Sequence, residues 1–159
     1  MNLLITGANG MVGKSLVPKI SKKKIKLLIP TSKELNLINL NQTRSYFKKN
    51  KINSVIHLAA RVGGILDNYK NNYKYFEENN FINSNLIKVA LENDVTKFIN
   101  LGSSCMYPSH ISKKMSEKIL FTGKPEKTNL GYALAKLSSA GICEVINRDL
   151  KLNYTTLIP

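Results

Sequence analysis

The sequence has few cysteines, few acidic residues and no long apolar run. Its two cysteines lie in different settings, Cys105 in a Gly/Ser-rich turn and Cys143 among apolar residues, so they form no disulfide framework and fit a reducing compartment. No segment approaches the roughly 18 consecutive apolar residues of a membrane-spanning helix. The first residues, NLLIT, enter a strand directly, without the basic region and cleavage site of a signal peptide. We therefore expect an unprocessed cytoplasmic protein with no membrane partner.

Arginine is scarce although the chain is strongly basic. The 159 residues include 24 Lys and Arg against 10 Asp and Glu, a net charge of +14, but 21 of the basic residues are lysine and 3 are arginine. Arginine is the residue that nucleic-acid-binding proteins use for bidentate contacts with bases and phosphates. The lysines are scattered, with one short run within 21–24. This pattern disfavours a nucleic-acid partner, whereas a basic surface suits an anionic ligand such as a nucleotide.

Short apolar runs alternate with segments of helical periodicity along a chain whose length suits one domain. This alternation indicates a parallel sheet with helices on both faces. Right-handed crossovers then give a doubly wound, Rossmann-like α/β fold whose ligand lies off the carboxyl ends of the strands. The connection 106–128 is long enough to be functional. The expected strands are Asn2–Thr6, Ile25–Ile29, Ser54–Leu58, Val95–Leu101 and Tyr154–Ile158, and the expected helices are Met11–Ser21, Asn39–Lys49 with Asn39 as its cap, Asn71–Asn93 and Asn129–Arg148.

A glycine-rich turn, TGANGMVG, follows the first expected strand and runs into the first helix. Its glycines, Gly7, Gly10 and Gly13, are spaced three apart. They allow a tight turn, close approach of the backbone to a pyrophosphate, and close packing of helix on strand. The start of a helix also offers free N–H groups and a positive dipole to phosphates. Because strand, turn and helix occur in this order, the motif predicts dinucleotide binding.

The residues after the second expected strand favour NADP(H) over NAD(H). An NAD site commonly has an acidic residue about 20 positions on, which binds the ribose hydroxyls. Lys33 stands at that distance from Gly13, preceded by Ser32, and the first acid, Glu34, comes later. A hydroxyl and a cation suit a 2′-phosphate, so we predict NADP(H).

Three polar residues form a candidate reductase site. Tyr132 and Lys136 are four residues apart in the last expected helix and so share one face. A lysine cation nearby favours the phenolate and lowers the pKa of a tyrosine, which could then act as acid and base near neutral pH. The pair alone is not specific, because one YxxxK is expected by chance in so lysine-rich a chain. Its position after the glycine turn and the NLGSSC strand tip is the stronger signal, and there Ser103 can bind a substrate carbonyl.

The other candidate residues are interpreted individually. Cys105 lies two residues after Ser103, so along an extended tip both side chains can lean the same way. A thiol acts as a base only where a neighbour favours the thiolate. His57 and Cys143 lie in apolar segments and are expected in the core, whereas His110 is a loop residue. No Cys/His/Asp cluster has metal-ligand spacing, so we expect no metal.

Several motifs together resemble a known family. The turn TGANGMVG, the serine at the fourth strand tip and YxxxK resemble the extended short-chain dehydrogenase/reductases. Within that superfamily, HLAARVGGI (57–65), LGSSCMYP (101–108) and GYALAK (131–136) are similar to the GDP-L-fucose synthases, which are GDP-4-keto-6-deoxy-D-mannose epimerase/reductases. The VGGI segment and the cysteine two residues past the serine are the features specific to the narrower family. The resemblance spans the whole chain.

The resemblance implies NADPH-dependent 3,5-epimerisation and 4-reduction of a GDP-sugar, in a cytoplasmic protein that forms a homodimer. It implies a partial NADP-binding domain over 1–159, followed in the family by a smaller substrate domain that holds a histidine partner for the cysteine. The family often has arginines where this chain has Asn9 and Ser32. The implied catalytic residues are Ser103, Cys105, Tyr132 and Lys136. The implied cofactor-binding residues are Gly7, Ala8, Asn9, Gly10, Met11, Val12, Gly13, Ser32, Lys33, Asn36, Leu37, Leu58, Ala59, Ala60, Leu101, Gly102, Ser103, Ser104, Lys136 and Pro159.

Two alternatives remain open at this point. One is another NAD(P)-dependent nucleotide-sugar epimerase or dehydratase, a group that usually holds NAD and favours threonine or alanine near the place of Cys105. The other is a cofactor-binding protein without catalysis, against which the intact set of Ser103, Tyr132 and Lys136 argues.

Overall fold

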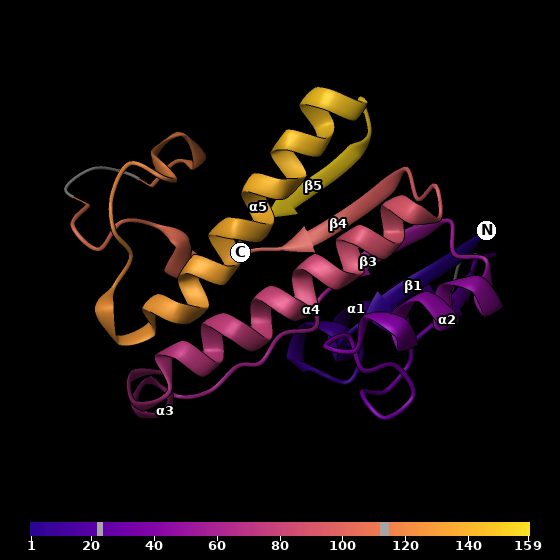
Figure 1. The fold of residues 1–159 in the computed structure, drawn as a ribbon, viewed down its shortest axis with the longest axis horizontal. Coiled ribbons are helices and arrows are strands. Elements are labelled where there is room, and N and C mark those ends of the chain that lie inside the picture. Colours follow the sequence, from indigo (N-terminus) through magenta and orange to yellow (C-terminus); the bar gives the residue numbers. More distant parts are fainter. Residues whose placement is uncertain (22–23, 112–114) are drawn as a thin grey trace.

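The computed structural model describes residues 1–21, 24–111 and 115–159. Within them a 5-stranded parallel sheet has the order β2-β1-β3-β4-β5 (Figure 1). The Rossmann-like fold class predicted from the sequence is thereby confirmed, whereas Lys22 and Lys23 of the lysine run lie outside the described residues. The strands are β1 (Asn2–Thr6), β2 (Lys26–Leu28), β3 (Ser54–His57), β4 (Lys97–Leu101) and β5 (Asn153–Leu157), and the helices are α1 (Met11–Ile20), α2 (Leu40–Asn50), α3 (Ile65–Lys70), α4 (Asn72–Glu92) and α5 (Leu130–Leu150).

The helix boundaries follow local signals that the sequence contains. Asn39 caps α2, since its Oδ1 accepts a hydrogen bond of 3.0 Å from the N–H of Gln42. Helix α3 was not predicted, because it has only 6 residues, too few for a periodic pattern.

The connection 106–128 also contains a short 3₁₀ turn, Glu117–Ile119. Helices α4 and α5 have 21 residues each, yet no helix in the described ranges is long and apolar enough to cross a membrane.

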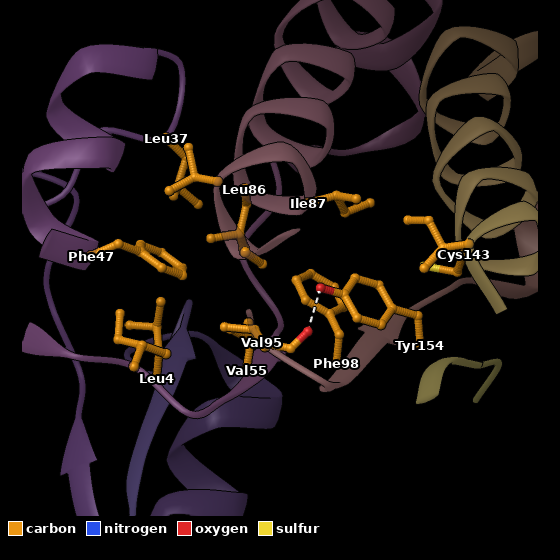
Figure 2. Close-up of a cluster of buried hydrophobic side chains, with 14 of the residues drawn as sticks. Leu4, Leu37, Phe47, Val55, Leu86, Ile87, Val95, Phe98, Cys143 and Tyr154 are labelled. Atoms are coloured by element: carbon orange, nitrogen blue, oxygen red, sulfur yellow. Dashed lines mark hydrogen bonds between the residues drawn. The ribbon is translucent and has the colours of Figure 1, made fainter. Parts of the chain in front are cut away.

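The main hydrophobic core lies between the sheet and helices α2, α4 and α5 (Figures 1 and 2). Each of four strands contributes an inward side chain. At one end the rings of Phe98 and Tyr154 stack at 5.0 Å, and the Tyr154 hydroxyl donates a 2.8 Å hydrogen bond to the Val95 carbonyl. Cys143 is 2% exposed in this core, as expected. The inward residues of the strands are Leu4, Val55, Phe98 and Tyr154, and those of the helices include Phe47, Leu86, Ile87 and Cys143.

The opposite face of the sheet is covered less completely than predicted. A smaller cluster joins Leu3, Ile5 and Ala8 to apolar residues around α1 and β2. Farther along the sheet, Ile99 on β4 is 36% exposed and Leu157 on β5 is 51% exposed. The prediction of helices on both faces therefore holds near β1 but is wrong for β4 and β5 within the described residues.

Helices α4 and α5 approach each other most closely at Gly131. Its N–H donates a 2.7 Å hydrogen bond to Oδ1 of Asn72, the first residue of α4. A Cβ atom at Gly131 would overlap the carbonyl oxygen of Asn72. Glycine is therefore required at this position, and it sets the start of α5 against the start of α4.

We predict that Gly131→Ala destabilises the protein by about 2 kcal/mol, because the added methyl group would push the two helix starts apart. Gly141→Ala is the matched control in the same helix. Its Cβ would meet Phe121 at 3.7 Å, an ordinary contact, so we expect no loss and up to ~1 kcal/mol of gain from helix propensity. Urea unfolding of both variants checks this, and equal stabilities would contradict the close approach.

Candidate active site

The carboxyl ends of the strands open into one cavity of about 700 Å³. It contains most of the predicted cofactor-binding residues together with Ser103, Tyr132 and Lys136. Lys33, Ser104 and Cys105 are not among its lining residues; Lys33 and Ser104 are exposed, and Cys105 is half-buried. The lining from the predicted set is Gly7, Ala8, Asn9, Gly10, Met11, Val12, Gly13, Ser32, Asn36, Leu37, Leu58, Ala59, Ala60, Leu101, Gly102, Ser103, Lys136 and Pro159, and the lining not predicted includes Thr6, Thr31, Leu35, Arg61, Val62 and Ile82.

The glycine turn forms one wall of the cavity. Gly7 has φ +70°, a left-handed conformation that favours glycine, and a Cβ there would lie 2.6 Å from the backbone nitrogen of Ala59. Gly10 is the N-cap of α1, and in the described structure no side chain caps that helix. The first N–H groups of α1 are therefore free for an anion.

The segment after β2 forms the far end of the cavity. The Glu34 carboxylate accepts two 2.8 Å hydrogen bonds, one from the backbone N–H and one from the hydroxyl of Thr31. These bonds, the backbone one first, hold the pKa of Glu34 below its usual value. The Glu34 side chain is therefore hydrogen-bonded within its own turn. Ser32, in the same turn, lines the cavity.

Tyr132 and Lys136 lie on the face of α5 that borders the cavity. The Lys136 ammonium donates a 2.7 Å hydrogen bond to the Leu101 carbonyl and lies 5.9 Å from the centre of the Tyr132 ring. The lysine side chain is almost fully buried, and burial lowers its pKa to about 8. The hydrogen bond to the carbonyl at the end of β4 therefore fixes the position of the Lys136 side chain.

The prediction that Lys136 lowers the pKa of Tyr132 is wrong for this structure. Burial raises the pKa of Tyr132, the nearby Cys105 sulfur raises it further, and a hydrogen bond with Ser103 offsets part of the rise. The reason is that the ammonium points to the Leu101 carbonyl instead of the phenol oxygen. Tyr132 consequently holds its proton.

The strand tip after β4 differs from the extended form expected from the sequence. Ser103 is extended, with φ −158°, but Ser104–Met106 form a turn of 3₁₀ helix. The backbone N–H of Cys105 donates a 3.3 Å hydrogen bond to the Ser103 hydroxyl, and the buried Met106 sulfur accepts one from the N–H of Ser103. Ser103 and Cys105 are thus adjacent within a turn. The Cys105 sulfur is near enough to Tyr132 to affect the pKa of that tyrosine.

A buried polar chain links the first strand to α5. The Thr6 hydroxyl lies 2.7 Å from Nδ1 of His57, and Nε2 of His57 lies 3.0 Å from Oδ1 of Asn83. Asn83 Nδ2 then donates a 3.2 Å hydrogen bond to the carbonyl of Ala135, next to Lys136. This arrangement assigns a neutral ring whose Nε2–H donates to Asn83. Burial holds the pKa of His57 down at about 3, and the charge of Lys136 contributes, so His57 is a core residue as predicted.

Arg61 is the main cavity residue that the sequence analysis missed. One guanidinium nitrogen contacts both carboxylate oxygens of Glu78 at 2.9 and 3.0 Å, and the group lies 5.0 Å above the Tyr75 ring. Its Nε is buried without a hydrogen-bond partner in the described chain. The available signal was its place four residues after the end of β3, in the segment HLAAR.

A second cavity, also about 700 Å³, lies within the long connection between β4 and α5. Its described lining includes His110, Lys124 and Lys127 but none of the four predicted catalytic residues. The convergence of strand ends, glycine turn and buried lysine therefore identifies the first cavity as the candidate active site.

Comparison with known proteins agrees with this geometry. The model of the NAD dependent epimerase/dehydratase family matches residues 3–159. The chain belongs to this family. Among curated family members, the GDP-L-colitose synthase of Yersinia pseudotuberculosis is 44% identical over 160 residues, which cover 100% of this chain and 52% of that protein. The GDP-L-fucose synthase of Azorhizobium caulinodans is 37% identical over 98% of this chain and 50% of that protein.

A solved structure of a GDP-L-fucose synthetase has the same fold over nearly the whole of this chain. The GDP-L-fucose synthetase of Naegleria fowleri, bound to NADP, superposes with a TM-score of 0.89 at 28% identity, over 99% of this chain and 53% of that one. The chain thus spans about half the length of the curated relatives it matches.

The neutral buried His57 predicts how stability depends on pH. Its pKa is about 3 in the folded protein and near 6.5 when unfolded, so the unfolded chain binds the proton first and stability is lost as pH falls from 6.5 towards 3. Between pH 6 and 4 we expect this effect to lower the free energy of unfolding of the wild type by roughly 2 kcal/mol. The His57→Gln variant should lack this loss, although it is less stable than the wild type at pH 7. Urea unfolding across this range measures it. His110→Gln, at the exposed histidine, should keep the wild-type slope.

Proposed function

We propose that the full-length protein is an NADP-dependent epimerase/reductase that converts GDP-4-keto-6-deoxy-D-mannose to GDP-L-fucose. The observation that carries the proposal is the grouping of Ser103, Cys105, Tyr132 and Lys136 at the end of β4, beside a glycine-walled cavity. The names of the relatives support the GDP-sugar substrate, and the NADP-bound structure supports the cofactor.

The cavity fits a dinucleotide. Two of its features match the needs of a pyrophosphate: a turn in which a Cβ at Gly7 would collide with Ala59, and a helix start at Gly10 without a side-chain cap. The net positive charge of the chain would also attract an anion. Ser32 would hold the adenosine ribose end, with Lys33 moving in to reach a 2′-phosphate. Lys136 and the residues around Gly102 would hold the nicotinamide end. NADPH, when bound, supplies the hydride that reduces the sugar ketone.

Reduction of the 4-ketone requires a proton as well as the hydride. Tyr132 keeps its proton in this structure, because its pKa is raised by burial, and it would donate that proton to the developing alkoxide. The Ser103 hydroxyl would hold the same oxygen. Lys136, anchored on the Leu101 carbonyl, would stabilise the phenolate that remains and relay a proton from solvent.

Epimerisation next to the ketone requires a base that removes a carbon-bound proton and an acid that returns one on the opposite face. Cys105 would supply the sulfur that handles one of these protons. Its place beside Tyr132 would bring the reduced carbon and the epimerised carbons within one site. The proposal includes an acid partner and a substrate domain outside residues 1–159, a homodimer and a cytoplasmic location, all on the basis of the family resemblance.

GDP-L-colitose synthesis is a second candidate. The observation in its favour is the higher identity to the Yersinia protein, 44% against 37% for the Azorhizobium GDP-L-fucose synthase. L-colitose is L-fucose without its 3-hydroxyl group, so C3 cannot be inverted in that reaction. Turnover of the 4-ketone with and without the 3-hydroxyl separates the two functions, and the preferred substrate identifies the sugar.

We predict that two substitutions separate the two half-reactions of the full-length protein. Cys105→Ser should stop the uptake of solvent deuterium by the GDP-4-keto sugar while NADPH binding is retained. Tyr132→Phe should keep deuterium uptake and reduce NADPH oxidation by about 10²–10⁴-fold, the usual cost of a lost acid. Mass spectrometry of the sugar and absorbance of NADPH measure the two steps.

Matched controls exist for both residues. Cys143→Ala changes the other cysteine, in the core, and Tyr73→Phe changes an exposed tyrosine on α4, so both should keep both steps. If Cys105→Ser still exchanges at the wild-type rate, the epimerase function fails. If Tyr132→Phe reduces the sugar normally, Tyr132 is only a helix residue.

The site also predicts a cofactor preference. Because Glu34 is bound to its own turn and Ser32 and Lys33 precede it, NADPH should bind more tightly than NADH. Lys33→Asp should shift the preference towards NADH, whereas Lys49→Asp, the same charge change on α2, should leave it unaltered. Calorimetric titration of the full-length protein decides this, and equal affinities in the wild type would contradict it.

A further inference from the structure

Arg61 is one of two charged residues that line the candidate active site within the described ranges, and the other is Lys136. No carboxylate belongs to this described lining, so both charges are positive. The Lys136 ammonium is bound to the Leu101 carbonyl, whereas Arg61 has no part in the proposed reaction. A cation on the wall of a nucleotide cavity attracts the negative charge of a ligand. The presence of Arg61 at this place therefore needs its own explanation.

The backbone of Arg61 lies close to the glycine turn. Ala59, two residues earlier, donates a 3.3 Å hydrogen bond from its N–H to the hydroxyl of Thr6, and Thr6 directly precedes Gly7. Two residues of chain span at most about 7 Å. Asn79, fully buried in α4, binds both polar groups of the Arg61 backbone: its Oδ1 accepts from the N–H at 2.8 Å, and its Nδ2 donates to the carbonyl at 3.0 Å. Arg61 is therefore held next to the wall that the glycine turn forms.

The guanidinium of Arg61 is only partly used by its partner in the protein. One terminal nitrogen makes both contacts with Glu78, and Nε is buried without a hydrogen-bond partner in the described chain. Arg44 differs, because its Nε and one terminal nitrogen each donate a 2.8 Å hydrogen bond to Glu92. Both glutamates belong to α4, so the two ion pairs are directly comparable. A buried N–H without an acceptor has a cost, so the contact with Glu78 satisfies Arg61 incompletely.

The position of Glu78 brings the guanidinium to the edge of the cavity. Ile82 lies one helical turn farther along α4, on the same face as Glu78, and it lines the cavity. The Arg61 side chain is 30% exposed, so it is not enclosed in the core. A change of side-chain rotamer would therefore be enough to turn the guanidinium from Glu78 towards a ligand, while Asn79 keeps the backbone in place.

We propose that Arg61 binds the diphosphate of NADP(H), and that its guanidinium leaves Glu78 to donate hydrogen bonds to the diphosphate oxygens. The inference rests on the proposed cofactor and assigns to it a residue that neither the glycine motif nor the family resemblance implied. A guanidinium forms paired hydrogen bonds with phosphate oxygens, which uses the N–H groups that Glu78 leaves unpaired. A GDP-sugar offers the same diphosphate chemistry, but the attachment of this loop to the glycine turn favours the cofactor.

Calorimetric titration of the full-length protein with NADP tests this assignment without turnover. Arg61→Met should weaken NADP binding about 10–100-fold, the usual effect of losing hydrogen bonds to a charged group. Arg61→Lys keeps the charge but not the planar fork, so it should recover only part of the affinity. Adenosine 2′-monophosphate has no diphosphate, and neither substitution should change its affinity. GDP, which has the diphosphate of the sugar substrate, is titrated in parallel.

Glu78→Gln and Arg44→Met are the matched controls. Glu78→Gln removes the carboxylate that competes for the guanidinium, so NADP should bind up to about fivefold more tightly, the value of a partly exposed ion pair. Arg44→Met removes the other ion pair to α4, which lies outside the described cavity lining, and should leave NADP affinity unchanged.

Four results would overturn the inference. NADP affinity could remain at the wild-type value in Arg61→Met, or Glu78→Gln could weaken NADP binding as much as Arg61→Met does, in which case the ion pair only holds α4. An equal loss for adenosine 2′-monophosphate would show a general disturbance of the cavity, and a loss for GDP alone would assign Arg61 to the sugar substrate. If Arg61→Met does not fold, Arg61→Lys gives the deciding titration. A wild-type protein that binds no NADP would reject the proposed cofactor itself.

Discussion

The buried chain from Thr6 through His57 and Asn83 to the Ala135 carbonyl is the constraint on which the site depends. Its members come from β1, β3, α4 and α5, which are far apart in sequence. The glycine turn follows β1, and Tyr132 and Lys136 lie on α5, so this chain links the two sides of the candidate site. Burial keeps the histidine of this chain neutral, because it lowers the pKa of His57 to about 3.

The close approach at Gly131 complements this chain at the start of α5. The polar chain fixes the middle of α5, whereas the Gly131–Asn72 contact fixes its first turn against α4. Cys105 then meets Asn129 one residue before that turn. Two anchors on one helix thus place Asn129, Tyr132 and Lys136 with little freedom, and a shift of the helix at either anchor would move Tyr132 relative to the Cys105 sulfur.

Most of the sheet and the cavity could be predicted because their signals are local. The glycine spacing after β1, the asparagine before α2 and the apolar strands each depend on a few neighbouring residues. The corrections at the site concern individual side-chain contacts, some distant and some close in sequence, that no sequence pattern encodes. The orientation of the Lys136 ammonium depends on the Leu101 carbonyl, 35 residues away in sequence. The 3₁₀ turn at Cys105 depends on the Met106 sulfur folding back to Ser103, and Arg61 depends on Glu78 and Tyr75 from α4. The hydrophobic periodicity of the sequence does not predict such pairs of contacting side chains.

The two pKa shifts on α5 have the same cause and bear on the proposed reduction. Burial raises the pKa of Tyr132 and lowers that of Lys136 to about 8, so burial disfavours both phenolate and ammonium. A protonated tyrosine is an acid, and reduction of a ketone needs an acid, whereas oxidation of an alcohol needs a base. In the free site Tyr132 is therefore in the protonated form that the proposed reduction would use. A charge that develops on the substrate oxygen would alter this balance, because the anion would attract the lysine proton towards the phenol and favour transfer from Tyr132. Burial of the pair therefore explains why the simple expectation for Tyr132 is wrong, and it keeps the phenol protonated until, in the proposed reaction, a substrate oxygen would accept the proton.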